Sequence, residues 1–447
     1  MKKFNKDKYL KKLKFKKYKR YIYIGLPCLL VFFLGIYFTY SKFSVSKDTE
    51  VVRTTVGDFI QGDIVIGAYL DGEYSKTIPG KNDGYIVDKI VCDNDASASW
   101  DSDSWGILVS NLTKRTKCNV YFHRNYLAPI IAQLDTTGKC PSVNDDGSVS
   151  VTGVESTDGY LCKAKDAYGD SYYYRGNVTN NYVKFADKYW RIVRINGNGT
   201  VRVIYDGTSA HANGESSDDR RIGMWSFNNI SNDNVYVGYM YGKARASTYS
   251  ETHSNTNNST IKTYLYDWYK TNILDTVNEQ YLTDNIYCND RSISSSIPNS
   301  KYNNLGYGTN ATAYRWYYGP WSDEGYNTSM KLICPQQNDA FTVSDTVYGN
   351  GALTYPIGLI TTDEVVLAGG WNVLNNGYYL YSGSWYWNLS PSSFYGGDAN
   401  ACFVGFNGIV SCGSDVRDYE GSVRPVLNLS QEVLKNGDGS MSNPYHP

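Results

Sequence analysis

Apolar and polar residues alternate over short distances in most of this chain, but one long apolar run stands near its start. Residues 21–40, YIYIGLPCLLVFFLGIYFTY, carry no charge, and about 20 apolar residues let a helix cross the hydrocarbon core of a membrane. Tyrosines lie near both ends of the run, as in membrane-interface belts. The run predicts a single transmembrane helix. The alternatives are a buried helix or a cleaved signal peptide, although no small-residue cleavage site follows.

After residue 40 the pattern changes to short β-like runs. Residues 41–60 predict a polar stalk, and residues 61–124 predict a small all-β spacer domain. Residues 125–138 predict a linker with a short helix, which Pro129 keeps short. The strand-like runs of the spacer are Ile64–Tyr69, Tyr85–Val91, Trp105–Val109 and Cys118–Phe122.

Residues 139–430 predict a larger domain, and residues 431–447 a tail. The clearest strand signal is a hairpin, with β-branched runs at Tyr189–Ile195 and Val201–Tyr205 around a turn of Asn and Gly. The content of 43 Tyr and 41 Gly in 447 residues also favours many short strands and turns.

Two helices are expected within this larger domain. Apolar residues recur at helical spacing in Ser259–Val277. The sequence TTDE at Thr361–Glu364 is a capping box before an apolar stretch, which Gly369 and Gly370 end. Two helices among many short strands predict an α+β fold class.

Charge is distributed unevenly along the chain. Residues 1–20 carry eleven Lys or Arg and one acidic residue, whereas the remainder carries 32 basic and 43 acidic residues. The positive-inside rule then predicts a basic cytoplasmic tip at 1–20 and extracellular domains after the 21–40 helix, so the expected localisation is single-pass in the cell membrane. The acidic body argues against nucleic acid as a partner.

Cysteine usage agrees with an oxidising compartment. Eight cysteines follow the apolar run, and an even number in an exported region suggests up to four disulfides. Eight cysteines allow 105 pairings, among which we expect sequence neighbours to pair. No CxxC occurs and the four histidines lack ligand spacing, so no metal is expected. The disulfide candidates are Cys92, Cys118, Cys140, Cys162, Cys288, Cys334, Cys402 and Cys412.

The segment Cys402–Cys412, CFVGFNGIVSC, permits a register argument. A two-residue turn at Asn407 and Gly408 would place the two cysteines on opposite faces of the hairpin. A three-residue loop, with Gly408 in the left-handed region, places Cys402 directly opposite Cys412. We therefore predict the three-residue loop and a cross-strand cysteine pair.

Several strings in the larger domain occur in a familiar order. They are WRIVRINGNG (190–199), GLITTDEVVLAGG (358–370), YWNLSPS (386–392) and VRPVLNL (423–429). Together they resemble a family of membrane-anchored bacterial surface proteins of unassigned function. Their order also resembles the C-type-lectin fold, shared by formylglycine-generating enzymes, which implies an antiparallel β domain with two helices. The EPN and WND calcium-binding triplets of sugar-binding members are absent.

Aromatic clusters are the best candidates for a ligand-binding site. No GxSxG, HExxH or P-loop motif occurs, so no catalytic residue and no cofactor is assigned. The segment YRWYYGPW offers Tyr314, Trp316, Tyr318 and Trp321 as ligand-binding residues that stack on sugar rings or fill a partner's pocket. Burial in the core is the equal alternative. Tyr379, Tyr381, Trp385 and Trp387 share a parity and are expected on one sheet face, with Trp385 and Trp387 in the core.

These observations favour a membrane-anchored extracellular protein that recognises a glycan or a surface protein through a disulfide-supported head. The alternatives are an envelope hydrolase or oxidase, and a purely structural envelope component.

Overall fold

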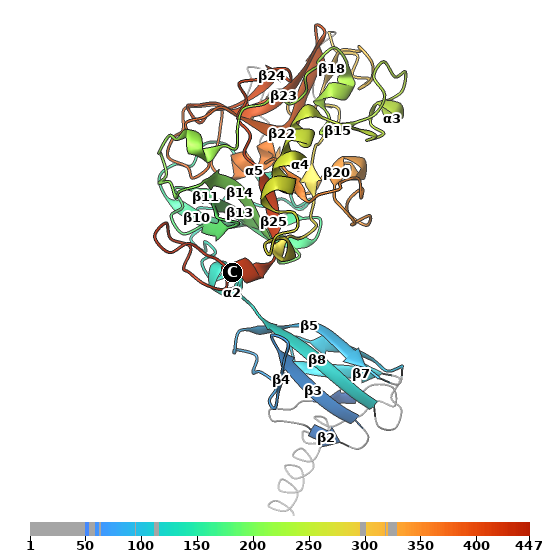
Figure 1. Cartoon of the computed structure of the whole chain (residues 1–447), viewed down its shortest axis with the longest axis vertical. Coiled ribbons are helices and arrows are strands. Elements are labelled where there is room, and N and C mark those ends of the chain that lie inside the picture. Colours follow the sequence, from blue (N-terminus) through green and yellow to red (C-terminus); the bar gives the residue numbers. More distant parts are fainter. Residues whose placement is uncertain are drawn as a thin grey trace, which may run out of the picture. The chain divides into compact units, whose positions relative to one another are not determined.

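The computed structural model describes residues 50–52, 59–61, 64–93, 95–110, 116–295, 301–317, 319–320 and 329–447. The chain divides into two compact units, the first ending at Asn125 and the second running from Tyr126 to Pro447 (Figure 1).

Two sheets make up the described part of the first unit. One has the order β2-β3-β8-β5 with β4 beside β3, and the other has the order β1-β7-β6. Alternate residues of β8 are buried because every second side chain of a strand faces the core. Strands β3, β5, β7 and β8 lie on the four predicted runs. The bounds are β1 Glu50–Val52, β2 Phe59–Gln61, β3 Ile64–Leu70, β4 Glu73–Ser75, β5 Tyr85–Cys92, β6 Ser97–Asp101, β7 Gly106–Ser110 and β8 Thr116–Arg124.

A seven-stranded antiparallel sheet forms the centre of the second unit. Its order is β10-β11-β13-β14-β25-β21, with β12 paired to β13. Every residue of β14 is buried, as expected of a central strand covered on both faces. The bounds are β10 Gly159–Asp166, β11 Gly169–Gly176, β12 Tyr182–Phe185, β13 Lys188–Ile195, β14 Val201–Gly207, β21 Ile357–Gly358 and β25 Val426–Leu429.

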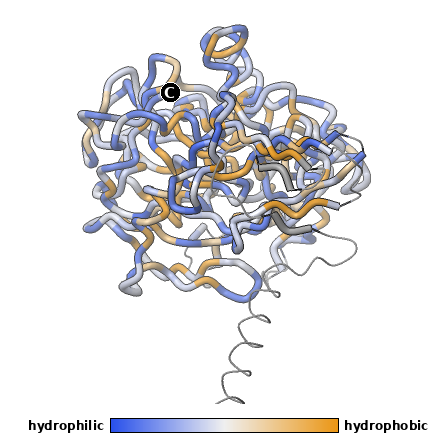
Figure 2. Tube along the Cα trace, turned by 90° about the horizontal axis from the view of Figure 1, so that it is seen from below, coloured by the Kyte–Doolittle hydropathy of each residue, from blue (hydrophilic) through white to orange (hydrophobic). Residues whose placement is uncertain are grey.

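A four-stranded sheet and three two-stranded sheets accompany the central sheet. Apolar segments gather in the interior and hydrophilic segments in the surrounding loops (Figure 2). The four-stranded sheet comprises β18 Thr312–Ala313, β22 Tyr386–Tyr395, β23 Asp398–Val404 and β24 Val410–Asp415. The two-stranded sheets pair β9 Val149–Ser150 with β19 Ser329–Met330, β15 Met240–Tyr241 with β16 Asn257–Asn258, and β17 Tyr287–Cys288 with β20 Ala340–Phe341.

Helices are few and short. The described residues contain α2 Ala128–Ile131, α3 Tyr249–Thr252, α4 Thr260–Asn272 and α5 Thr362–Leu367, with short 3-10 turns between strands. The predicted α+β class is therefore wrong, because the part of the chain that the structure describes is mostly β. The two helices predicted for the larger domain do form, but they span too few residues to make helices a major part of the fold.

The predicted single-pass membrane topology is also not supported. In the part of the chain that the structure describes, no helix has the length and apolar character needed to span a membrane. Residues 21–40, which carried that prediction, lie outside the described residues.

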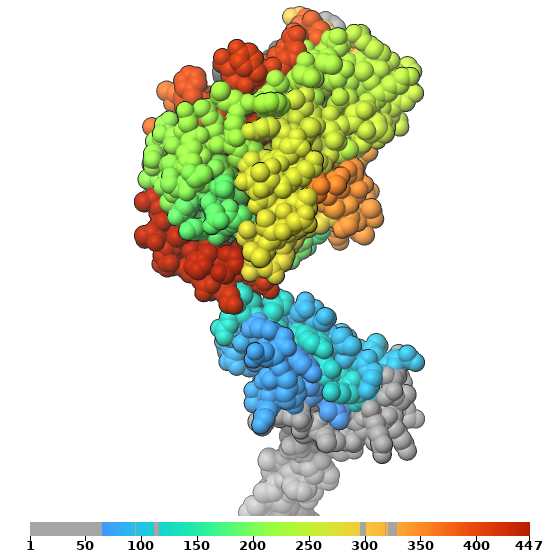
Figure 3. Space-filling view, viewed as in Figure 1, coloured from blue at the N-terminus to red at the C-terminus, as the bar shows by residue number. Residues whose placement is uncertain are grey.

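The two predicted helices of the larger domain are confirmed with shorter bounds. Ser259 caps α4 by accepting a hydrogen bond from the Lys262 amide, and the helix buries Ile261, Leu265 and Tyr269. Its other side forms a strip of the molecular surface (yellow in Figure 3). The TTDE capping box is present at α5, where the Thr361 and Glu364 side chains each bond the other's backbone amide.

The predicted cysteine hairpin is confirmed. Cys402 pairs with Cys412 across β23 and β24, and the chain turns through a three-residue loop in which Gly408 has a φ of 79°. Neighbouring cysteines pair throughout, in the disulfides Cys92–Cys118, Cys140–Cys162, Cys288–Cys334 and Cys402–Cys412.

The shared sheet face expected for Tyr379, Tyr381, Trp385 and Trp387 is wrong. Strand β22 begins only at Tyr386, and the preceding residues form turns. Because these residues lie outside a strand, their side chains do not alternate between two sheet faces. The adjacent Tyr378 and Tyr379 are accordingly both buried. Trp387 is a core residue as expected, whereas Trp385 is half-buried against the core.

Candidate binding cleft

A cleft of about 400 Å³ opens at one edge of the central sheet of the second unit. It lies where β10 begins and β11 ends, beside the segment that follows β11. Gln133, which follows α2, lines one side of the cleft. Its lining residues are Gln133, Gly159, Tyr160, Leu161, Tyr174, Asn177, Val178, Thr179 and Asn180. None of these side chains carries a formal charge at neutral pH.

Local backbone requirements shape this corner of the sheet. Gly159 pairs with Gly176 at the open end of the β10–β11 hairpin. A Cβ on Gly159 would lie 2.8 Å from the Asn177 carbonyl oxygen. Gly176 has a φ of 83°, which releases the chain from β11 into the loop. The disulfide Cys140–Cys162 fixes β10 beside the cleft.

Side-chain amides provide most of the polar lining. The Asn180 Nδ2 group donates to Gln133 Oε1 over 2.6 Å, which joins the two sides of the cleft. The Asn177 Oδ1 atom accepts a hydrogen bond from Asn213. Three side-chain groups have no partner within the described residues: the Asn177 Nδ2 group, the Asn180 Oδ1 atom and the Thr179 hydroxyl. A donor, an acceptor and a hydroxyl therefore remain available to a ligand.

Tyr160 supplies an aromatic ring held by charged neighbours. Its hydroxyl donates to Asp158 over 2.8 Å, and the Lys139 ammonium lies 5.0 Å from the ring centroid. Lys139 also pairs with Asp158 at 3.6 Å. Burial and the Asp158 contact raise the pKa of Tyr160, so its hydroxyl remains a donor. The ring is thus held in place by contacts outside the cleft lining.

One lining residue, Tyr174, has a buried hydroxyl without a hydrogen-bond partner in the described structure. The residue is 2% exposed. Burial raises the pKa of Tyr174, which keeps the group protonated. A buried hydroxyl without a partner costs about 1–3 kcal/mol, and such groups are uncommon in native structures.

A buried arginine supports the loop side of the cleft. Arg191 on β13 donates to the Val178 carbonyl over 2.7 Å and to Asn213 Oδ1 over 3.0 Å. Asn213 in turn donates to Asn177 Oδ1 over 2.6 Å and to the Val178 carbonyl over 2.8 Å. The position of the 177–178 segment therefore depends on residues behind it.

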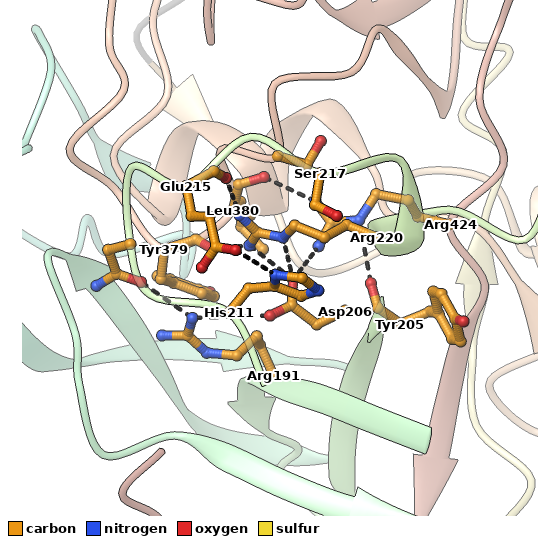
Figure 4. A network of polar contacts seen from close by, with 12 residues as sticks. Arg191, Tyr205, Asp206, His211, Glu215, Ser217, Arg220, Tyr379, Leu380 and Arg424 are labelled. Atoms are coloured by element: carbon orange, nitrogen blue, oxygen red, sulfur yellow. Dashed lines mark hydrogen bonds and ion pairs between the residues drawn. The ribbon is translucent and has the colours of Figure 1, made fainter. Parts of the chain in front are cut away.

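Arg191 belongs to a cluster of three arginines around one carboxylate (Figure 4). Asp206 Oδ1 accepts from Arg220 over 2.7 Å and from Arg424 over 2.8 Å, and Arg191 lies 3.9 Å from Oδ2. All four side chains are fully buried. We call these four residues the arginine cluster.

One carboxylate does not neutralise three guanidinium groups. Backbone carbonyls of Val178, Glu215, Tyr205 and Leu380 accept further hydrogen bonds from the cluster, and Arg191 stacks 3.8 Å above the Tyr182 ring. Burial still lowers the pKa of Arg191 and of Arg424. The cluster is a rigid scaffold rather than an exposed anion site.

His211 lies in front of this cluster, next to Glu215 (Figure 4), and it belongs to a serine–histidine–carboxylate arrangement. Ser209 Oγ is 3.3 Å from His211 Nε2, and Glu215 Oε1 is 3.0 Å from Nδ1. However, Asp219 Oδ2 also lies 3.0 Å from Nε2 and accepts the Ser209 hydroxyl over 3.1 Å. Because a second carboxylate occupies the nitrogen that a general base needs, the arrangement does not activate Ser209.

The predicted aromatic platform does not form at Tyr314 and Trp316. Both side chains are fully buried, the Tyr314 hydroxyl donates to Asn234 over 2.9 Å and the Trp316 indole donates to Asp363 over 3.0 Å. They fill the core, which was the stated alternative. Tyr318 and Trp321 lie outside the described residues.

The pattern of residues along the chain does not predict the cleft. Its one local signal is the polar run Asn177–Asn181 directly after a strand that ends in glycine, and that pattern occurs in many ordinary loops. Gln133 and Asn213 join it only through tertiary contacts. Among the described residues no three His, Cys, Asp or Glu side chains form a group that could hold a metal ion.

Comparison of the chain with family models, with curated proteins and with solved structures gives no match. The resemblance to surface proteins and to the C-type-lectin fold therefore stays a prediction.

Proposed function

We propose that this chain is a non-enzymatic recognition protein whose second unit binds an uncharged glycan in the cleft at 159–161 and 177–180. The observation that carries the proposal is the cleft's chemistry. It combines unpaired amide and hydroxyl groups with the Tyr160 ring and has no charged side chain in its lining. Sugars present hydroxyl edges and apolar ring faces, which suit amides and an aromatic ring respectively.

The four disulfides support a site of action in an oxidising compartment, where exposed glycans occur. A protein partner is less well matched, because a cavity of this size accepts a small ligand or a few sugar units.

The test is an array of neutral and acidic glycans probed with the purified chain, followed by calorimetric titration of the best hit. Tyr160→Ala removes the ring, and Asn180→Ala removes both the unpaired amide oxygen and the bond to Gln133. Each is expected to weaken binding about five- to thirtyfold, because a lost hydrogen bond or ring contact costs about 1–2 kcal/mol.

Asn232→Ala is the matched control, since Asn232 is exposed and its side chain makes no hydrogen bond among the described residues. Equal affinities for the parent, Tyr160→Ala and Asn180→Ala would remove the cleft from the proposal. Selective binding of acidic glycans would contradict the uncharged class.

A further inference from the structure

One tryptophan of the second unit is open to solvent outside the cleft. Trp225, which follows the 3-10 turn Asp218–Arg220, is 45% exposed. By contrast, Trp190, Trp316 and Trp387 are fully buried, as expected of so large an apolar ring. Trp225 is not among the lining residues of the cleft. Its ring is therefore a separate candidate for contact with a ligand.

One face of the Trp225 ring is covered by the ring of Tyr264 on α4. The two rings are nearly parallel, with an interplanar angle of 8° and centroids 4.9 Å apart. The exposed area of Trp225 therefore belongs to the opposite face and to the ring edges. Its indole nitrogen has no hydrogen-bond partner within the described residues, so the site also offers one donor.

Three hydrogen bonds fix the segment and the helix residue that carry these rings. The Trp225 amide donates to the Gly421 carbonyl over 2.8 Å, and its carbonyl accepts from the Trp387 indole over 2.9 Å. The Tyr264 hydroxyl donates to the Ile222 carbonyl over 2.8 Å. A ring that is already fixed loses little conformational entropy when a ligand stacks on it.

The packing beneath Trp225 requires two glycines. A Cβ on Gly223 would lie 2.3 Å from the Tyr264 hydroxyl oxygen, and a Cβ on Gly421 would lie 2.2 Å from the Trp387 indole nitrogen. Both of these polar atoms donate the hydrogen bonds that hold the ring pair in place. A larger residue at either position would displace one of these donors, so the local sequence suits this arrangement.

The charges near the ring favour a neutral ligand. Arg221 pairs with Asp218 at 2.6 Å. Arg417, whose carbonyl accepts a hydrogen bond from the Ser226 hydroxyl, pairs with Asp398 at 3.0 Å. Nucleic acids combine stacking on aromatic rings with cations that contact their phosphates. A phosphate would have to compete with carboxylates for these arginines, whereas a neutral sugar needs no cation.

We propose that Trp225 and Tyr264 form a second glycan-binding site, in which a neutral β-linked sugar stacks on the open face of the indole. Trp225 is the contact residue and Tyr264 the positioning residue. β-Linked glucose and N-acetylglucosamine present axial C–H bonds on flat ring faces, which match an aromatic ring, and their oxygens accept from the indole nitrogen. The choice of a neutral glycan rests on the proposed function, although the residues differ from those of the cleft.

The test is fluorine NMR of the purified full chain labelled with fluorotryptophan, titrated with cellotetraose and with chitotetraose. The chain has 10 tryptophans, and the resonance that Trp225→Phe removes identifies Trp225. That resonance is expected to shift with at least one of the two sugars. The concentration dependence of its shift gives the affinity of this site alone.

Variants that keep Trp225 then test the ring pair. Tyr264→Ala removes the supporting ring and is expected to weaken the affinity about three- to tenfold, the value of one aromatic contact. Tyr264→Phe keeps that ring and is expected to preserve the affinity. Phe406→Ala is the matched control, because Phe406 is 69% exposed and stacks on no ring within the described residues. Equal affinities for the parent and Tyr264→Ala would overturn the positioning role.

The cleft and the second site are separated by Tyr160→Ala, which alters only the cleft. A Trp225 shift with the same affinity in this variant supports the second site, even where the glycan array removes the cleft. A shift that Tyr160→Ala abolishes would mean that Trp225 only reports binding in the cleft, and would overturn the inference. So would a Trp225 resonance that neither sugar moves, whatever the array shows. A resonance that moves only with a proline-rich peptide would assign the ring to a protein partner instead.

Discussion

Some charged side chains of this protein are buried away from water. Lys262, in the first turn of α4, is 1% exposed. Its ammonium donates to Asn258 Oδ1 over 2.9 Å and lies 3.9 Å from the Tyr266 ring centroid. An amide oxygen and an aromatic ring offset the lost hydration of the ammonium less well than a carboxylate would. Burial therefore lowers the pKa of Lys262 to about 8.

This burial predicts a pH-dependent stability. An unfolded lysine has a pKa near 10.4, so the unfolded chain binds the proton more tightly than the folded chain. The free energy of unfolding should therefore rise as the pH rises from about 8 to about 10. Lys262→Met is expected to remove that rise and to stabilise the protein by about 3 kcal/mol at pH 7.

Urea unfolding across that pH range measures both effects. Lys270→Met, on the exposed side of the same helix, serves as the control and should leave the pH profile intact. Profiles of Lys262→Met and Lys270→Met that run parallel would show that Lys262 is not the residue responsible.

At the scale of elements, the segments predicted correctly are those whose signals are local. The capping box at Thr361–Glu364 and the loop at 406–408 are each decided by a few adjacent residues. Pairings such as β14 with β25 join residues more than 200 positions apart, and no local pattern contains them. The cleft is missed for the same reason, because Gln133 meets Asn180, and Asn213 meets Asn177, only in the folded chain.

Helix α5 is an element that its surroundings stabilise. Six residues are too few for an independent helix. Glu364 accepts from the Thr361 amide over 3.0 Å and pairs with Arg194 at 3.1 Å and Arg202 at 2.5 Å. The carboxylate therefore joins the start of α5 to β13 and β14.

Substitutions at the two ends of the capping box should lower the free energy of unfolding by different amounts. Thr361→Ala removes one cap and is expected to lower the free energy of unfolding by about 1 kcal/mol. Glu364→Gln retains a cap acceptor but deprives the buried Arg202 of its anion and leaves Arg194 with Asp166 alone, so we expect a loss of about 3 kcal/mol or more. Denaturant unfolding measures both, with the exposed Glu432→Gln as the neutral control. Equal losses for Thr361→Ala and Glu364→Gln would mean that the ion pairs add nothing beyond the cap.

At the scale of the whole molecule, each unit contains what it needs to fold. The first has a core around Ile66, Val109 and Val120 and the disulfide Cys92–Cys118. The second has its own extensive core and three disulfides. Within the second unit, Arg424 binds Asp206 from 218 positions away. Strands near the C-terminal end of the unit therefore complete the sheet that its N-terminal strands begin. We expect the whole unit to unfold in one cooperative step.

This organisation predicts that residues 126–447 fold without the preceding chain. The fragment should show a single cooperative thermal transition, because its central sheet uses strands from both ends of the fragment. A shorter fragment ending at residue 420 lacks Arg424 and β25 and should not fold, since it leaves Asp206 and the β14 edge without partners. Calorimetry and near-ultraviolet circular dichroism compare the two fragments. A folded 126–420 fragment, or an unfolded 126–447 fragment, would contradict this account, and the folded longer fragment should retain the glycan affinity of the full chain.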